Sequence, residues 1–372
     1  MAQPVWGNAN AGWQLALPGW TYRFPQDHGN HPGFKTEWWY FTGNLRSETG
    51  RSFGYQLTFF RQGIRPPGER SGTNSRLLAN DIAFAHFAVS DIDENKFYFF
   101  QEITRGAFGE ASFGLGNNEA IYRIERWSCR RTGLHDFELR AEGPAVSIRL
   151  DLHSAKDPVF HGSEGISRKA EGEGRASHYY SLTRLITRGE LTLPSGTHRV
   201  EGTSWFDHEW ATNQLTENQT GWDWFSIHFN DGSELMIFQI RTRDGGRDAH
   251  SGGTWIAADG TTIPVSNEEF LLSPISHWKS PASGADYPVH WKLSIPKLAL
   301  DLKIQAAMPE QELNFPPVIY WEGAIRALGS RADQPVSAAG YLEMTGYGSP
   351  IVGMQSPGSE SPAPPDNRPS PR

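Results

Sequence analysis

The chain has 372 residues and a formal net charge of −8, too modest and too evenly spread to give the basic footprint of a nucleic-acid-binding protein. This length exceeds the size at which one hydrophobic core usually stops growing, so we expect two domains. A single cysteine, Cys129, excludes both an intramolecular disulfide and a metal site built from cysteines, and no apolar stretch approaches the ~20 residues that span a bilayer as a helix.

Aromatic residues and turn formers dominate the composition, with 14 Trp, 21 Phe, 11 Tyr, 39 Gly and 25 Pro. Aromatic side chains favour strands, and Gly and Pro mark turns. Runs of alternating apolar and polar residues recur between such turns along most of the chain. We therefore predict an all-β protein, a tandem of two antiparallel β-barrels. A pair of sandwiches is the alternative, because periodicity does not distinguish the two.

The predicted elements divide the chain into four parts. Residues 1–23 form a lead-in, and residues 24–215 form the first barrel, with strands near 37–45, 52–62, 82–91, 96–104, 121–129, 135–141, 146–152, 178–186, 188–193 and 197–210. The Gly- and Ser-rich stretch 161–177 within it is predicted to be a mobile loop. Residues 216–353 form the second barrel, in which Asp231-Gly232 predicts a hairpin. Residues 354–372 are almost all Pro, Ser, Gly and charge, which predicts disorder.

The first strand, "TEWWYFTGNL", places large rings on both faces, since neighbouring side chains of a strand point in opposite directions. A barrel strand would carry such rings if a second domain or the lead-in covered its outer face. Trp38, Trp39 and Tyr40, with Glu37 before them, are therefore candidate walls of a ligand site. Core packing alone is the alternative interpretation.

"GTSWFDHEW" is the first stretch that could carry chemistry. On a strand, Trp205, Asp207 and Glu209 share one face. Burial beside an indole ring raises the pKa of a carboxyl group and makes it a usable acid near neutral pH. A solvated or ion-paired face is the alternative.

Two further stretches place polar and aromatic residues together. In "ASHYYSLTRL", His178 and Tyr180 share a face and could relay a proton or anchor a ligand. In "GWDWFSIHFND", Trp222, Trp224 and His228 share a face whose rings could stabilise a cation. A histidine bonded to a carbonyl and ordinary core packing are the respective alternatives.

The stretch "QDHGNHPGFKTEWW" places Asp27, His28, His31 and Glu37 close together in sequence. Imidazole and carboxylate are common zinc ligands, so this spacing suggests a zinc site. A hydrogen-bonded turn explains the intervening Gly and Pro equally well, and we predict no metal. The sequence also contains no G-x-S-x-G, P-loop, Rossmann or H-E-x-x-H signature.

Together with "YWEGAI" and "GYLEMTGY", these stretches resemble, in the same order over residues 24–347, the AttH and carotenoid 1,2-hydratase (hydroxyneurosporene synthase) family. The resemblance implies two lipocalin-like barrels and no organic cofactor. The hydratase branch adds water to a terminal isoprenoid double bond. The chain is more similar to the AttH-type branch, often labelled secreted hydrolase or found beside ABC-transporter components, through "TEWWYFTGNL" and "WFDHEW".

The resemblance also assigns roles to residues. Asp207 matches the acid that protonates the alkene, Trp205 the aromatic before it, and His178 and Tyr180 the His-x-aromatic pair, with His178 a candidate to take the proton of the added water. His208, Glu209 and Trp210 depart from the hydratase pattern. Protonating an alkene gives a carbocation, which requires a neutral carboxylic acid and aromatic faces in a dry pocket.

We therefore expect a protein that binds an isoprenoid- or lipid-like molecule in an aromatic-lined barrel cavity near Asp207 and hydrates it. A non-catalytic carrier, or an accessory protein of an ABC export system, is the alternative. A hydrolase is a second alternative, without a recognisable nucleophile motif. We expect a periplasmic or secreted location from the resemblance, and a cytoplasmic location is the alternative.

Overall fold

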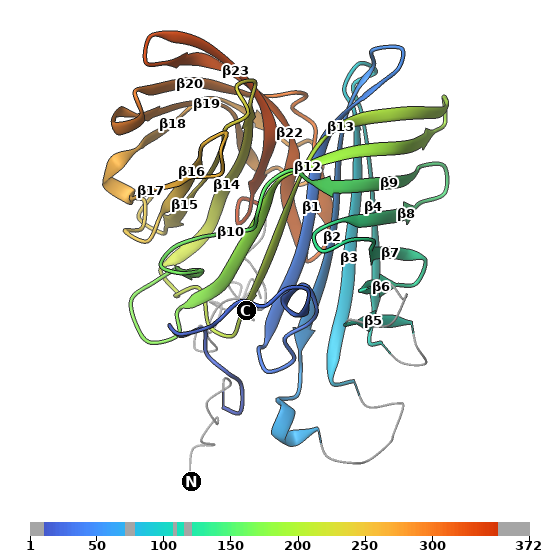
Figure 1. Cartoon of the computed structure of the whole chain (residues 1–372), viewed down its shortest axis with the longest axis vertical. Coiled ribbons are helices and arrows are strands. Elements are labelled where there is room, and N and C mark those ends of the chain that lie inside the picture. The colour runs from blue at the N-terminus through green and yellow to red at the C-terminus, as the bar shows by residue number, and fades with distance from the viewer. Residues whose placement is uncertain (1–10, 71–78, 107–109, 115–120, 349–372) are drawn as a thin grey trace, which may run out of the picture.

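The computed structural model of the protein describes residues 11–70, 79–106, 110–114 and 121–348. These residues form two large antiparallel sheets that lie side by side (Figure 1). The predicted all-β class and tandem of lipocalin-like barrels are confirmed, and one barrel is nearly closed. The predicted tail, 354–372, and residues 1–10 of the lead-in lie outside the described residues.

The first sheet has 13 strands in the order β4-β3-β2-β1-β13-β12-β9-β8-β7-β6-β5, with β10 and β11 paired to β12. Their bounds are β1 (Thr36–Ser47), β2 (Ser52–Gly63), β3 (Asp81–Asp91), β4 (Lys96–Thr104), β5 (Ala111–Phe113), β6 (Tyr122–Ile124), β7 (Trp127–Arg131), β8 (Phe137–Glu142), β9 (Ser147–Ser154), β10 (Val159–Phe160), β11 (Ile166–Arg168), β12 (Ala176–Leu193) and β13 (Gly196–Ala211). The pairing of β1 with β13 brings the earliest strand against the last one.

The second sheet has 10 strands in the order β17-β16-β15-β14-β23-β22-β20-β19-β18, with β21 paired to β22. Their bounds are β14 (Gln219–Phe229), β15 (Glu234–Thr242), β16 (Gly252–Ile256), β17 (Thr262–Val265), β18 (Leu271–Lys279), β19 (Asp286–Ile295), β20 (Leu300–Ala306), β21 (Glu312–Phe315), β22 (Val318–Arg331) and β23 (Gln334–Met344). The predicted hairpin at Asp231-Gly232 joins β14 to β15, and Gly232 has the left-handed φ of 87° that favours glycine.

Helical structure is confined to short 3-10 turns among the described residues. They are η1 (Gln26–His28), η2 (Pro67–Glu69), η4 (Asn267–Glu269) and η5 (Pro296–Leu298). In the part of the chain that the structure describes, no helix has the length and apolar character needed to cross a membrane.

Three predictions about local structure are wrong. The single strand predicted at 121–129 is the hairpin β6–β7, which turns at Glu125, where φ is 51°. The two strands predicted at 178–186 and 188–193 are one strand, β12, which continues through a register shift between Leu182 and Leu185. The stretch predicted as a mobile loop contains β11 and the buried side chain of His161.

Hydrophobic residues form separate cores inside the first barrel, inside the second barrel and between the two. The first core contains Trp39, Phe59, Phe87 and Trp127, each with at most 1% of its surface exposed. These buried side chains lie in the interior of the first barrel, where the sequence predicted a ligand cavity. Asp207 instead lies beside Trp205 and Tyr179, which pack toward the second barrel, so a ligand site near Asp207 lies outside the first barrel.

The core between the barrels contains Tyr40 and Trp205 of the first sheet and Trp224 and Tyr341 of the second. The backbones approach closely beside it, since a Cβ atom added to Gly54 would lie 2.8 Å from the Cβ atom of Ala324. The aromatic rings of β1 are therefore divided between the interior of the first barrel and the core between the barrels.

Trp39 and Phe41 pack into the first barrel, whereas Trp38 and Tyr40 pack toward the second. The outer face of β1 is thus covered by the second barrel, as the run of rings predicted.

We predict that Trp39→Ala lowers the free energy of unfolding by about 3–5 kcal/mol, because its fully buried ring leaves a cavity and its indole N–H loses the carbonyl of His28 at 3.2 Å. Trp38→Ala is expected to cost less, since Trp38 is only half-buried. Chemical denaturation followed by circular dichroism measures both variants. Equal losses would contradict this division of the rings.

Candidate functional site

Strand register determines which side chains meet at the interface. Strands β1, β13 and β12 are neighbours, and their pairing places side chains in rows across the sheet. Two rows face the second barrel, given from β1 to β12: Tyr40, Asp207 and Ser181 in one, and Trp38, Glu209 and Tyr179 in the next.

Asp207 is 4% exposed and accepts three hydrogen bonds. The indole N–H of Trp205 lies 2.6 Å from Oδ1, the hydroxyl of Tyr179 lies 2.8 Å from Oδ2, and the hydroxyl of Ser181 also donates to Oδ1. Burial raises the pKa of Asp207 to about 7, although the three donors oppose that rise. Asp207 therefore gains or loses its proton near neutral pH.

A row of the second sheet faces Asp207. Glu322, Glu343 and Trp224 lie side by side on β22, β23 and β14. At one end of this row, Glu322 is hydrogen-bonded to the hydroxyl of Tyr40. At the other end, the indole N–H of Trp224 donates to the hydroxyl of Tyr179 at 3.1 Å. These two cross-links place Glu343, the middle member of its row, opposite Asp207.

Both glutamates of this row favour their neutral forms. Burial, with smaller contributions from the charges of Glu209 and Asp207, raises the pKa of Glu343 to about 8, although a hydrogen bond from Trp222 opposes that rise. Burial and the neighbouring Glu343 hold the pKa of Glu322 well above its ordinary value. Glu343 is half-buried, whereas Glu322 is 1% exposed. Glu343 is thus the more accessible of the two acids.

Other side chains complete the interface. Glu209 accepts a hydrogen bond from Ser177 and lies 3.5 Å from the ammonium group of Lys169. Trp222 packs against the core between the barrels. His228 donates to the carbonyl of Thr183 at 2.6 Å. The interface between the barrels therefore contains both hydrogen-bonded polar groups and aromatic rings.

Four of the predicted site residues lie on the opposite face of the sheet. His178, Tyr180, Trp39 and Glu37 face the interior of the first barrel. The register explains this, because Ser181 is the partner of Asp207 and Tyr180 is that of His208. The structure therefore does not bring His178 and Tyr180 to Asp207, and His178 is not placed to take a proton there.

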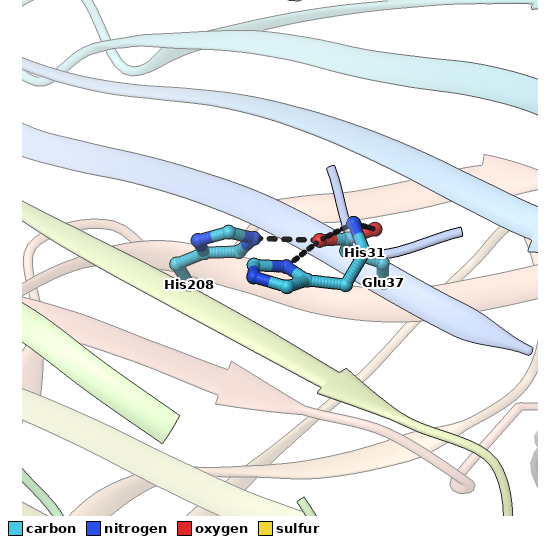
Figure 2. Close-up of side chains that lie close together, drawn as sticks. All are labelled: His31, Glu37 and His208. Atoms are coloured by element: carbon cyan, nitrogen blue, oxygen red, sulfur yellow. Dashed lines mark hydrogen bonds and ion pairs between the residues drawn. The ribbon is translucent and has the colours of Figure 1, made fainter. Parts of the chain in front are cut away.

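A buried network of charges occupies the inner face (Figure 2). Glu37 Oε1 lies 2.7 Å from His31 Nδ1 and 3.0 Å from His208 Nε2, and Oε2 lies 3.1 Å from Arg61. His31 Nε2 lies 3.1 Å from Asp27. Burial alone would raise the pKa of Glu37, but His31, His208 and Arg61 hold it well below its ordinary value.

In this network, the potential ligand atoms of His31, Glu37 and His208 lie within 4.8 Å of one another, close enough to consider a shared metal ion. Both ring nitrogens of His31 face carboxylate oxygens, however, so the ring is an imidazolium that donates twice and has no lone pair for a metal. Burial would lower the pKa of His31, but Glu37 and Asp27 outweigh it and raise that pKa. We assign an ion-pair network.

The zinc set considered from the sequence is also divided by the fold. His28 Nδ1 lies 2.7 Å from the hydroxyl of Tyr180, and its Nε2 lies 3.0 Å from His135. Both ring nitrogens of His28 therefore contact other residues, and neither contacts His31 or Glu37. The network instead fastens the segment before β1 to the strands of the first barrel.

A pocket of about 410 Å³ opens beside the interface. Its lining includes Met236, Phe238 and Thr254 of the second barrel and His161 of the first. His161 is 1% exposed and hydrogen-bonds to Thr254 and to Ser181, which in turn contacts Asp207. The pocket is thus connected to Asp207 through two side chains.

Sequence reasoning missed several residues of this site. Tyr179 and Ser181 alternate with the predicted pair in "ASHYYSLTRL", so the register of β12 against β13 would have identified them. Glu322 and Glu343 stand in "YWEGAI" and "GYLEMTGY", which were noted without a role. His161 lies in a Gly-rich stretch that carried no signal.

Comparison with known proteins defines the family. The AttH-like profile matches residues 15–347. The chain belongs to the AttH-like family. The crystal structure of an AttH protein from Nitrosomonas europaea is 32% identical, with a TM-score of 0.80, covering 90% of this chain and 99% of the other.

More distant structures share the fold of this AttH-like protein. Kievitone hydratase from Nectria haematococca is 14% identical, with a TM-score of 0.68, covering 92% of this chain and 98% of its own. CghA in complex with Sch210972 is 10% identical, with a TM-score of 0.54 and the same coverages. Comparison with curated proteins gives no match. Association with ABC-transporter components and export stay predictions.

We predict that Glu37→Gln lowers the free energy of unfolding by about 3–5 kcal/mol at pH 7, because Arg61 and the His31 imidazolium lose their buried partner. The folded-state pKa of Glu37 lies below its ordinary value of 4.5, so its contribution is present above that value and is lost as pH falls through the folded pKa. The deficit of the variant should therefore shrink at acid pH.

Denaturant titrations at pH 7 and at the lowest pH at which both proteins still fold measure this difference, with Glu310→Gln, an exposed position, as the control. If Glu37→Gln lowers the free energy of unfolding by the same amount at both pH values, the charge of Glu37 is not responsible for the loss.

We also predict that neither zinc nor a chelator shifts the melting temperature of the wild-type protein, because His31 offers no lone pair. A melting temperature raised by stoichiometric zinc, with Glu37→Gln insensitive to it, would contradict the ion-pair assignment.

Proposed function

We propose that this AttH-like protein binds a lipophilic, isoprenoid-like molecule between its two barrels and adds water to a double bond of that molecule. One observation carries the proposal: the carboxyl group of Asp207 is withdrawn from solvent between Trp205 and Tyr179 and changes protonation near pH 7. A carboxylic acid that retains its proton in an apolar site can protonate a weak base such as an alkene.

The surrounding side chains suit the charge that would develop. Transfer of the proton from Asp207 to one alkene carbon uses the π electrons to form a C–H bond and leaves a cation on the other carbon. The half-buried rings of Trp38 and Trp222 offer electron-rich faces to such a cation. Water then forms the C–O bond, and the proton that the oxygen loses is released to solvent, which leaves Asp207 to be reprotonated.

Glu343 supports an uncharged ligand. Its pKa of about 8 keeps it largely neutral at pH 7, so the accessible acid opposite Asp207 adds little charge to the site. The structural likeness to kievitone hydratase, a hydratase by name, supports the same class of reaction. That likeness concerns fold, and the assignment of chemistry to this chain rests on the site around Asp207.

The test begins with native mass spectrometry of the freshly purified full chain to identify a bound lipid. That lipid, and a panel of isoprenoids with terminal double bonds, are then incubated with the protein in oxygen-labelled water. We expect a labelled alcohol from the wild type and from Glu310→Gln. Asp207→Asn should bind the ligand within a few-fold of wild type and form no alcohol, since an amide of the same shape cannot protonate the alkene.

The rate should be greatest at acid pH and should fall as pH rises through about 7, because Asp207 is then ionised. A tightly bound lipid that never becomes labelled in the wild type would overturn hydration and favour the carrier. A labelled alcohol formed equally well by Asp207→Asn would remove Asp207 from the chemistry.

A further inference from the structure

A buried chain of hydrogen bonds leads from Asp207 to the pocket beside the interface. The Ser181 hydroxyl contacts Asp207 Oδ1, and its oxygen lies 2.7 Å from His161 Nε2. His161 Nδ1 lies 2.9 Å from Thr254 Oγ1. Ser181 and His161 are at most 1% exposed, whereas His161 and Thr254 border the pocket. These hydrogen bonds therefore join the buried acid, Asp207, to a pocket that water can reach.

The partners of Asp207 determine where its proton can point. The indole N–H of Trp205 can only donate. The hydroxyl oxygen of Tyr179 accepts the indole N–H of Trp224, and among the described residues Asp207 is the acceptor for its hydrogen. Ser181 is the remaining partner, and a hydroxyl group can donate or accept. In the protein without a bound ligand, the proton of neutral Asp207 is therefore directed at Ser181, and it has to turn from Ser181 toward the alkene in the proposed reaction.

His161 allows this series of hydrogen bonds two consistent arrangements, because a neutral imidazole carries one N–H and one lone pair. With Asp207 ionised, Thr254 donates to Nδ1, Nε2–H donates to Ser181, and Ser181 donates to Asp207. With Asp207 neutral, Asp207 donates to Ser181, Ser181 donates to Nε2, and Nδ1–H donates to Thr254. The ring hydrogen is then on Nδ1. Burial and Lys169 lower the pKa of His161 to about 3, so the ring is neutral in both cases.

We infer that Ser181 and His161 form a proton relay that connects Asp207 with the pocket bordered by Thr254. A hydronium ion in the pocket gives its proton to Thr254 Oγ1 and becomes water. In the same sequence, Thr254 passes its hydrogen to Nδ1, Nε2 passes its hydrogen to Ser181, and Ser181 passes its hydrogen to Asp207. One proton enters, each O–H or N–H bond that breaks is replaced, and the His161 tautomer changes.

The relay gives Asp207 a route for reprotonation through buried side chains rather than through the proposed ligand site. Its use in turnover rests on the proposed function, whereas its existence does not require a substrate. Asp207 faces three other acids, from β13, β22 and β23: Glu209, Glu322 and Glu343. His161 faces Lys169. The acids lie at the Asp207 end of the relay, and Lys169, at the His161 end, disfavours a charged His161 ring.

Nitrogen NMR of the full chain with labelled histidine tests the inference, and the His161 signals are identified by their loss in His161→Gln. We expect a neutral ring whose hydrogen moves from Nε2 to Nδ1 as pH falls through the titration of Asp207, followed by the labelled carboxyl carbon. In Ser181→Ala, and in Asp207→Asn, the tautomer of His161 should no longer change over that pH range.

His228 provides a control in the same spectra, because the carbonyl of Thr183 holds its hydrogen on Nε2 over the pH range in which Asp207 titrates. A His161 tautomer that stays constant while Asp207 titrates would overturn the relay, and so would a switch that survives in Ser181→Ala. A wild-type protein that switches but yields no labelled alcohol would refute the proposed hydration and leave the relay in place.

Discussion

Side chains along β1, β12 and β13 alternate between two buried environments, and this constraint organises the whole molecule. One face of these strands packs into the first barrel, and the other packs against the second. Where these strands pack against the second barrel, both faces are largely withdrawn from bulk water, so buried polar groups there require a partner or must become neutral. Asp207 and His208 are adjacent in sequence, yet they belong to different chemical environments.

The two faces accommodate buried charge in different ways. On the inner face, Glu37 meets the positive charges of Arg61 and His31, and ionised forms are stabilised. On the outer face, burial is the largest cause that raises the pKa values of Asp207 and Glu343, and neighbouring carboxyl groups add to the rise. On the inner face, the opposite charges stabilise the packing of the segment before β1 against the strands of the first barrel. Burial among neighbouring carboxyl groups lets the acids of the outer face keep their protons near neutral pH.

The AttH-like fold persists at 14% identity in kievitone hydratase, so the scaffold tolerates extensive change. Function must then be argued from the interface between the barrels rather than from the fold. Here the interface brings Asp207, Glu343 and the rings of Trp38 and Trp222 together from both barrels. The pocket bordered by His161 and Thr254 adds a polar route to the same acid.

The sequence by itself determined the all-β class, the hairpin at Asp231-Gly232 and the shared face of Trp205, Asp207 and Glu209, because turn chemistry and two-residue periodicity are local properties. Periodicity did not distinguish barrels from sandwiches, and lipocalin-like barrels were what the family resemblance implied. The sequence could not determine which face of β12 meets Asp207, since a shift of one residue in register exchanges Tyr180 for Ser181. Nor could it place Glu343 or His161 there. Those contacts join residues far apart in sequence, 20 positions for His161 and Ser181 and 26 for Ser181 and Asp207, and only strand register, burial and the packing of one barrel on the other decided them.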